Sequence, residues 1–228
     1  VVGQIEQFLQ EAISQMEPDE IEARRVGPGR PRILPSLCLW AGLLVCVLHR
    51  FSSQLALWRL LTSGGFWSYP RFPVSDQAVY DRLEEAGTKP MEGLFGQISA
   101  VLAQRLVPFA QQDLAPFATA VVALDESTLD SVARKLPALR SVPKGDDRLL
   151  PGKIAGLFDL RLQQWRKVQF IPYAKQNEKV AARSMLEGLL EGALILFDLG
   201  YFAFSWFDDL TNKGYWWVSR FRDKTSYS

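Results

Sequence analysis

Apolar residues recur at helical spacing through the first hundred residues, with polar residues between them. Start and stop signals divide this pattern. Ser63-Gly64-Gly65 can end one helix, and Ser75 is placed to cap the next. The pattern predicts helices over residues 4–16, two between 34 and 61, one beginning at Ser75, and one over 91–106. The first part of the chain is therefore expected to be a set of packed helices.

From residue 119 the pattern changes to short apolar runs typical of buried strands. Residues 119–125 form the first run. Residues 153–160 and 165–171 flank a polar turn and predict a hairpin. Further strands are expected over 193–197 and 215–221. The order of elements predicts an α/β fold, which becomes α+β overall when the helical front part is included.

Two helices are expected between these later strands. Asn177 can cap the first, and Gly192 can stop it. Its expected apolar face consists of Val180, Ala181, Met185, Leu186, Leu189 and Leu190. The second runs through Leu210 to a stop at Gly214.

Two aspartates follow apolar runs: Asp125 ends the first predicted strand, and Asp198 ends the fourth. A crossover that returns the chain beside its start makes these strands parallel neighbours, which brings both carboxylates to one edge of the sheet. Such a pair is a site for Mg²⁺ or Mn²⁺, the cations of phosphoryl transfer. The alternative is that each aspartate only ends a strand and caps the next turn.

The small number of histidines and cysteines argues against several kinds of metal site and catalytic site. The chain has one histidine, His49, and two cysteines, Cys38 and Cys46, which a helix would hold too far apart to bridge. Zinc sites, histidine triads and haem ligation are therefore poorly supported. The apolar run 37–48 is too short to span a bilayer, and residues 1–20 carry no export signal. We expect a protein of the cytoplasm, associated with the nucleoid, that does not contact the membrane.

Basic residues are unevenly distributed. Residues 134–183 carry 12 Lys/Arg against 4 Asp/Glu, which marks this block as a place for a phosphate backbone or, alternatively, as an ordinary solvated face. Lys153, Arg166 and Lys167 are the candidate contacts within it. The Pro/Gly-rich segment 22–32 adds Arg30 and Arg32, which suit the minor groove of A·T-rich DNA or belong to a plain tether.

The predicted helices between residues 34 and 106 are compatible with a helix-turn-helix-like reader of DNA. In that interpretation the helix after Ser75 presents Gln77, Tyr80 and Arg82 outward. A helical bundle with no role in DNA binding explains the same residues.

Three sequence blocks resemble a known family. LDEST (124–128), FDLGYF (197–202) and GYWWVSRFRDKTSY (214–227) are similar to the first-aspartate, second-aspartate and following-strand blocks of bacterial insertion-sequence DDE transposases of the insertion-sequence-four group. The resemblance covers residues 119–228 well and the helical front part loosely. It implies an RNase H-like mixed sheet with flanking helices, in which Asp125 and Asp198 bind catalytic metal ions.

The resemblance also implies an activity and partners. Transposases of this group cut DNA at the terminal inverted repeats of the transposon and transfer the freed 3′ hydroxyl to target DNA, and they can act as homodimers on DNA. Arg220 and Arg222 match basic positions of the third block and are candidate phosphate contacts. We expect residues 1–33 to form an acidic helix and a basic linker, 34–112 a helical DNA-binding region, and 113–228 an incomplete catalytic domain.

One family feature is missing. The family's third carboxylate is a glutamate in a Y-x2-R-x3-E-x6-K pattern, which does not occur before Ser228, near where the family has a β-rich insertion. Glu126, Glu178, Glu187 and Glu191 do not lie in the corresponding topological place. Two other readings remain open: a non-catalytic DNA-binding relic of a transposase, and a nuclease or resolvase on the same fold.

Overall fold

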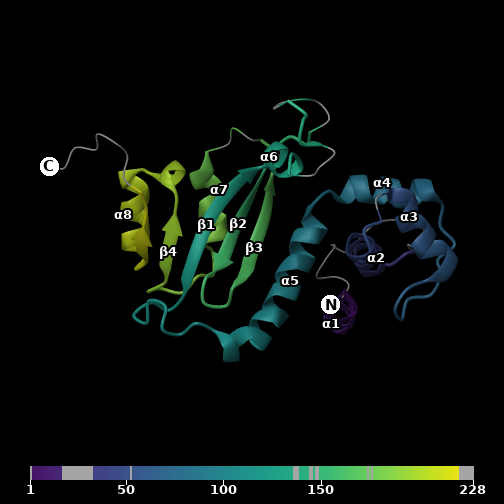
Figure 1. Ribbon diagram of the computed structural model, residues 1–228, viewed down its shortest axis with the longest axis horizontal. Coiled ribbons are helices and arrows are strands. Elements are labelled where there is room, and N and C mark those ends of the chain that lie inside the picture. Colours follow the sequence, from purple (N-terminus) through teal and green to yellow (C-terminus); the bar gives the residue numbers. More distant parts are fainter. Residues whose placement is uncertain are drawn as a thin grey trace, which may run out of the picture. The chain divides into compact units, whose positions relative to one another are not determined.

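The chain folds into two compact units, Val1–Val101 and Leu102–Ser228, which are considered separately below. The computed structural model (Figure 1) describes residues 2–16, 33–51, 53–135, 139–143, 146, 149–173, 175 and 177–220.

The first unit is helical, as the apolar spacing predicts. Its elements are α1 (Val2–Ser14), α2 (Ser36–Leu48), α3 (Gln54–Arg59), the π-helical turn η2 (Leu60–Gly64), α4 (Asp76–Ala86) and most of α5 (Lys89–Leu106). The centre of the core is α2, whose side chains are apolar all round; Leu39 and Trp40 are buried there against Leu57 and Leu61. Ser53 and Ser75 cap α3 and α4 with their side-chain oxygens.

The single histidine and the cysteines have structural places in this unit. Glu6 of α1 accepts hydrogen bonds from Trp67 Nε1 and pairs with His49 Nε2, both at 2.9 Å, and these contacts lower the pKa of Glu6. Cys38 and Cys46 are free, buried thiols, and burial raises the pKa of Cys38 to about 12. The expectation that the two cysteines do not form a bridge is confirmed.

Helix α4 presents fewer polar groups than the DNA-reader interpretation requires. The guanidinium of Arg82 donates to Leu34 O and, at 2.6 Å, to Ser36 Oγ, so it ties α4 to the start of α2. Tyr80 packs against the core of the unit, and of the three side chains Gln77 alone is exposed. The prediction that all three side chains point outward is therefore wrong for Tyr80 and Arg82, because both serve packing within the unit.

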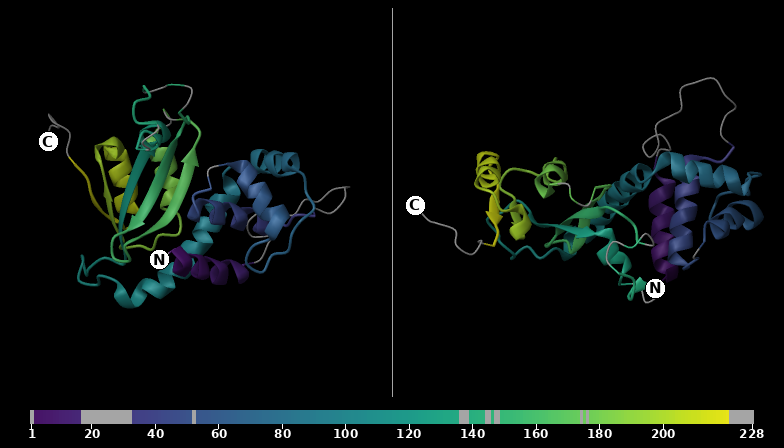
Figure 2. Two further views of the ribbon diagram at one scale, coloured as in Figure 1. Left: turned by 45° about the vertical axis from the view of Figure 1, so that its right-hand side comes forward. Right: turned by 90° about the horizontal axis from the view of Figure 1, so that it is seen from above.

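The second unit is built on a mixed five-stranded sheet. The strands are β1 (Val121–Thr128), β2 (Lys153–Asp159), β3 (Gln164–Ile171), β4 (Leu194–Phe197) and β5 (Trp216–Val218). Their order is β3-β2-β1-β4-β5; β1, β2 and β3 pair antiparallel, whereas β4 is parallel to both β1 and β5 (Figures 1 and 2). The fold is therefore mixed α/β, and this open sheet is consistent with a partial RNase H-like fold.

Two helices cover one face of the sheet. They are α7 (Glu178–Met185) and α8 (Phe204–Asn212), which lie on the same side of the strands (Figure 2, right). The core between them contains Val122 and Leu124 of β1 and Ile195 and Phe197 of β4. Short helical segments complete the unit: η3 (Val107–Phe109), α6 (Leu129–Ala133) and η5 (Leu199–Tyr201). We call the face under α7 and α8 the covered face and the other the open face.

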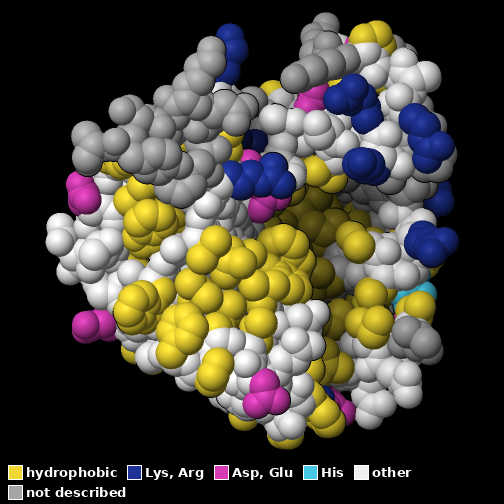
Figure 3. All heavy atoms as spheres, turned by 60° about the vertical axis from the view of Figure 1, so that its left-hand side comes forward, with side chains coloured by type: hydrophobic (Ala, Val, Ile, Leu, Met, Phe, Trp, Pro, Cys, Tyr) yellow, Lys and Arg dark blue, Asp and Glu magenta, His cyan; other side chains and the backbone are white. Residues whose placement is uncertain are grey.

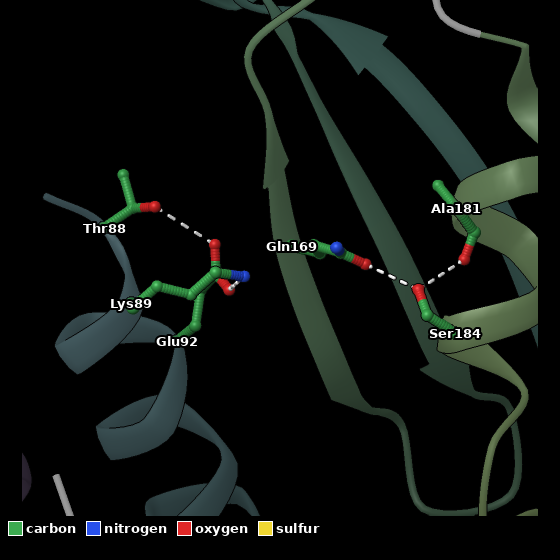
Figure 4. A network of polar contacts seen from close by, with 6 residues as sticks. All are labelled: Thr88, Lys89, Glu92, Gln169, Ala181 and Ser184. Carbon is green, nitrogen blue, oxygen red and sulfur yellow. Dashed lines mark hydrogen bonds and ion pairs between the residues drawn. The ribbon is translucent and has the colours of Figure 1, made fainter. Parts of the chain in front are cut away.

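Helix α7 is shorter than its apolar pattern predicts, and side chains of β3 contact its C-terminal end. Lys167 Nζ donates to the carbonyl oxygens of Ser184 and Glu187, and Ser184 Oγ lies 2.9 Å from both Ala181 O and Gln169 Oε1 (Figure 4). The helix ends at Met185 rather than near Gly192.

The predicted apolar face of α7 is only partly buried. Ala181, Met185 and Leu186 are buried, but Val180 and Leu190 are more than half exposed. That part of the prediction is wrong: Leu190 lies beyond the end of the helix at Met185, and Val180 lies within the helix but on its exposed side.

Among the residues that the structure describes, no helix combines the length and the apolar character needed to cross a lipid bilayer.

Candidate active site

The register of β1 and β4 brings the two candidate aspartates to one row of the sheet. These parallel strands pair from Val121 with Leu194 to Leu124 with Phe197. Asp125 directly follows Leu124, and Asp198 directly follows Phe197. The two aspartates therefore occupy neighbouring positions on strands whose axes lie about 4.8 Å apart. The expected parallel pairing of the first and fourth predicted strands is confirmed. We call these two residues the acidic pair.

The acidic pair lies on the open face. Val122 and Leu124 point into the core, so the alternation of a strand turns Asp125 to the opposite face, where its side chain is exposed. Asp198 keeps an extended backbone after β4 and is exposed as well. Two charges this close on an exposed edge repel each other unless a cation lies between them.

The two aspartates differ in local role. The sequence predicts that the first strand ends at Asp125, and this is wrong. Strand β1 continues to Thr128, because it pairs with β2 up to that residue, whereas its pairing with β4 ends at Leu124. Asp198 caps η5, because its Oδ1 accepts the Gly200 N–H at 2.9 Å. The capping alternative thus describes part of what Asp198 does, and this contact uses only one of its two carboxylate oxygens.

A third carboxylate, Glu126, adjoins the pair in sequence but lies on the other face. Its side chain is 3% exposed and forms an ion pair with Lys153, itself 5% exposed, beneath the sheet. Glu126 therefore belongs to the covered face, as strand alternation requires, and is turned away from Asp125. Within the described ranges, no group of three or more His, Cys, Asp or Glu side chains is placed to hold a metal ion.

Sequence reasoning missed an aromatic neighbour of the acidic pair. Across β1 and β2, Asp125 is paired with Gly156, and the ring of Trp165 from β3 fills the space where a side chain at Gly156 would lie. Trp165 is 47% exposed on the open face. The only available signal was a glycine within an apolar strand, which often marks a close approach of another group.

Three of the candidate DNA contacts already bind other groups of the protein. The ammonium of Lys153 is buried against Glu126, and Lys167 completes the end of α7; burial lowers the pKa of Lys167. Arg166 Nε pairs with Asp159 Oδ2 at 2.9 Å. In this conformation all three basic groups have internal roles. Arg30, Arg32 and Arg222 lie outside the described residues.

Arg220 is exposed and follows the end of β5. Its neighbour Ser219 donates from Oγ to Asp198 O at 3.3 Å, which ties the end of β5 to the second aspartate. Arg220 also lines an apolar pocket of about 180 Å³ formed mainly by Phe202, Phe204, Phe207 and Trp217. Hydrophobic side chains gather on the surface seen from the α8 side of the molecule (Figure 3), and Phe204 and Trp216 are more than half exposed.

Two exposed carboxylates at neighbouring positions offer oxygen ligands for a hard divalent cation. Two carboxylates with further positions left for water or phosphate oxygens suit Mg²⁺, which rarely takes an all-protein cage. Neither known protein families nor curated proteins provide a match to this chain.

Proposed function

We propose that the chain is a DDE-type transposase, whose second unit belongs to a metal-dependent catalytic domain that cuts transposon-end DNA and joins it to target DNA. The observation that carries the proposal is the placement of Asp125 and Asp198 in one row of parallel neighbours. The strand order β3-β2-β1-β4-β5 and the three resembling sequence blocks support the same assignment.

In this proposal the acidic pair, Arg220 and the residues that support them each have a defined role. The carboxylates of Asp125 and Asp198 would hold Mg²⁺ or Mn²⁺, which supplies activation of the attacking oxygen and stabilisation of the leaving oxygen in an in-line displacement. Arg220 binds a phosphate of the DNA strand and holds its register against the acidic pair. The covered face fixes both strands from below, through Leu124 and Phe197 next to the acids in sequence. The site therefore holds its charges on a rigid support.

The full reaction needs a third carboxylate, which the family has on a later helix. Glu126 does not take this place, because its side chain is on the covered face. An active transposase therefore requires the glutamate pattern beyond Ser228. A DNA-binding relic would lack it, and a nuclease or resolvase would cleave without joining ends.

We further propose a location and partners that follow from the function: the cytoplasm, at the nucleoid, with terminal inverted repeats and target DNA as ligands. A homodimer on DNA that bridges two transposon ends is part of this proposal, since joining two ends needs two active sites.

The proposal is tested by DNA cleavage with the full-length protein. Labelled duplex DNA carrying the terminal repeats that flank the gene is incubated with Mg²⁺, Mn²⁺ or EDTA. We expect cleavage at the repeat ends in either metal and none in EDTA, followed by strand transfer into plasmid DNA. Binding without cleavage would favour the relic, and cleavage without strand transfer would favour the nuclease.

Replacing Arg220 with alanine is expected to weaken DNA binding about equally for all sequences. The plot of log K against log salt concentration has a negative slope, and loss of one phosphate contact makes that slope shallower by about 1. Fluorescence anisotropy over a range of salt concentrations measures this slope. Lys213→Ala, at an exposed lysine that follows α8 and precedes β5, is the control for a general loss of charge. An unchanged slope for Arg220→Ala would remove this residue from the interface.

A further inference from the structure

The backbone of η5 fixes one of the two carboxylate oxygens of Asp198. Its Oδ1 accepts the N–H of Gly200 at 2.9 Å. The backbone of Asp198 is extended, with φ of −84° and ψ of −175°, so its side chain can reach the second N–H of the turn that follows. This hydrogen bond holds the carboxylate in one rotation about χ2. Oδ2 is then the oxygen of Asp198 that is left for a cation.

The turn that carries the N–H donor is anchored in the core beneath the covered face. Tyr201, the last residue of η5, is 1% exposed and belongs to that core. Its ring packs edge-on against Phe197, with ring centroids 5.8 Å apart. Phe197 and Tyr201 are therefore buried on either side of Asp198 and Gly200 in the sequence. This support holds both the carboxylate and the N–H that binds it in fixed positions.

The carboxylate of Asp125 is not held in this way. Within the part of the chain that the structure describes, it forms no hydrogen bond or ion pair, and it is exposed on the open face. Asp125 can therefore turn either of its oxygens toward a ligand. The acidic pair combines one oxygen of fixed direction, Asp198 Oδ2, with one adjustable carboxylate.

The number of oxygens that Asp198 offers bears on the choice of cation. Ca²⁺ takes about six to eight oxygen ligands in a flexible geometry and often binds both oxygens of one carboxylate. Mg²⁺ is smaller and requires a near-ideal octahedral shell of single oxygens, several of them from water. A carboxylate whose Oδ1 already accepts an N–H is a poor ligand through both oxygens. The contact with Gly200 therefore suits Mg²⁺ better than Ca²⁺.

We propose that the N–H of Gly200 is a specificity determinant of the metal site: it holds Asp198 as a monodentate ligand and so favours Mg²⁺ and Mn²⁺ over Ca²⁺. This inference rests on the proposed function and names the class of cation that its site selects. Gly200 is a positioning residue, because it acts through the carboxylate of Asp198. Capping of η5 and binding of a cation are then two uses of one side chain rather than alternatives.

The test removes the donor with Gly200→Pro. Gly200 is the second residue of a 3-10 turn, and the fixed φ of proline suits the first turn of a helix. Mn²⁺ binding to the full-length protein is followed by electron paramagnetic resonance of the free ion, with Ca²⁺ added as competitor. Mn²⁺ affinity should fall about 10- to 100-fold, the usual effect of losing a group that orients a metal ligand. Ca²⁺ affinity should fall less, so the Mn²⁺/Ca²⁺ affinity ratio decreases.

Two further variants separate the hydrogen bond from the effect of a proline on folding. Gly200→Ala keeps the N–H and should retain most of the wild-type ratio. Asp198→Glu introduces no proline, and its extra methylene carries the carboxylate past the N–H of Gly200. Both oxygens of the glutamate are then available to Ca²⁺, so the ratio should decrease as it does in Gly200→Pro.

Lys179→Pro is the matched control. The same kind of contact caps α7, where Asn177 Oδ1 accepts the Lys179 N–H at 3.0 Å. Lys179 is the second residue of α7, as Gly200 is of η5, but α7 lies over the covered face and the acidic pair lies on the open face. Removal of this N–H should leave the Mn²⁺/Ca²⁺ ratio unchanged. Circular dichroism checks that each variant is folded.

The effect of Gly200 must pass through Asp198. In an Asp198→Asn background, Gly200→Pro should cause no further loss of Mn²⁺ affinity, whereas in Asp125→Asn it should cause its full loss. The inference is overturned if wild-type protein does not prefer Mn²⁺, if folded Gly200→Pro or Asp198→Glu keeps the wild-type ratio, or if the loss persists in Asp198→Asn.

Failure of the proposed function gives a different result. A preference for Mn²⁺ that depends on Gly200 and Asp198, without cleavage of terminal-repeat DNA, would leave a selective metal site on a protein that does not cut. Cleavage together with an unaltered ratio in Gly200→Pro would keep the enzyme and remove Gly200 from its site.

Discussion

Asp125→Asn and Asp198→Asn are each expected to lower metal-dependent cleavage of terminal-repeat DNA by about 10²- to 10³-fold, the size of effect seen when one preorganised contact to a transition state is lost. Asparagine keeps the size of the side chain and removes its charge. The row of β1 and β4 should stay intact, because both positions are exposed and neither packs in the core.

Metal binding separates this effect from a general loss of activity. Mn²⁺ binding, measured by titration calorimetry, should weaken strongly in both variants, since each removes one of two charged ligands. Asp113→Asn changes an exposed carboxylate of the same unit outside the row and is the matched control. Cleavage that persists in Asp125→Asn or Asp198→Asn would exclude the acidic pair as the catalytic site.

Much of this site could be predicted because its determinants are local. A buried strand needs a continuous apolar run, and the runs before Asp125 and Asp198 mark both strands clearly. Parallel neighbours follow from the strand, helix and strand order, and register then places the next residues side by side. The residue at which each strand ends was less predictable. Strand β1 continues past Asp125 because β2 pairs with the edge of β1 that faces away from β4.

The surroundings of the candidate basic residues depend on contacts between residues that are distant in the sequence. A run of basic residues in β2 and β3 has the composition of a phosphate site, but strand alternation sends Lys153 and Lys167 to the covered face. There one pairs with Glu126 and the other completes α7. The position of Trp165 over Gly156 depends on the register shift between Leu157 and Phe158, which no local pattern shows.

The buried pair of Glu126 and Lys153 gives the largest expected effect on stability. Both side chains are at most 5% exposed, so removing one partner leaves a buried charge without its main compensation. Glu126→Gln and Lys153→Met are each expected to lower the free energy of unfolding by about 3–5 kcal/mol. Urea denaturation measures the loss, and hydrogen exchange of the β1 and β2 amides assigns it to the sheet.

The double variant decides whether the charges or the packing matter. Glu126→Gln combined with Lys153→Met removes both charges and should recover most of the loss, because replacement of a whole buried ion pair is often neutral. Arg183 of α7 and Asp209 of α8 form an exposed pair at 3.1 Å, and Arg183→Met combined with Asp209→Asn should change stability by less than about 1 kcal/mol. If the double variant is as unstable as the sum of its single variants, the two residues act independently. Glu126 would then be held on the covered face by packing alone, and its separation from the acidic pair would not depend on Lys153.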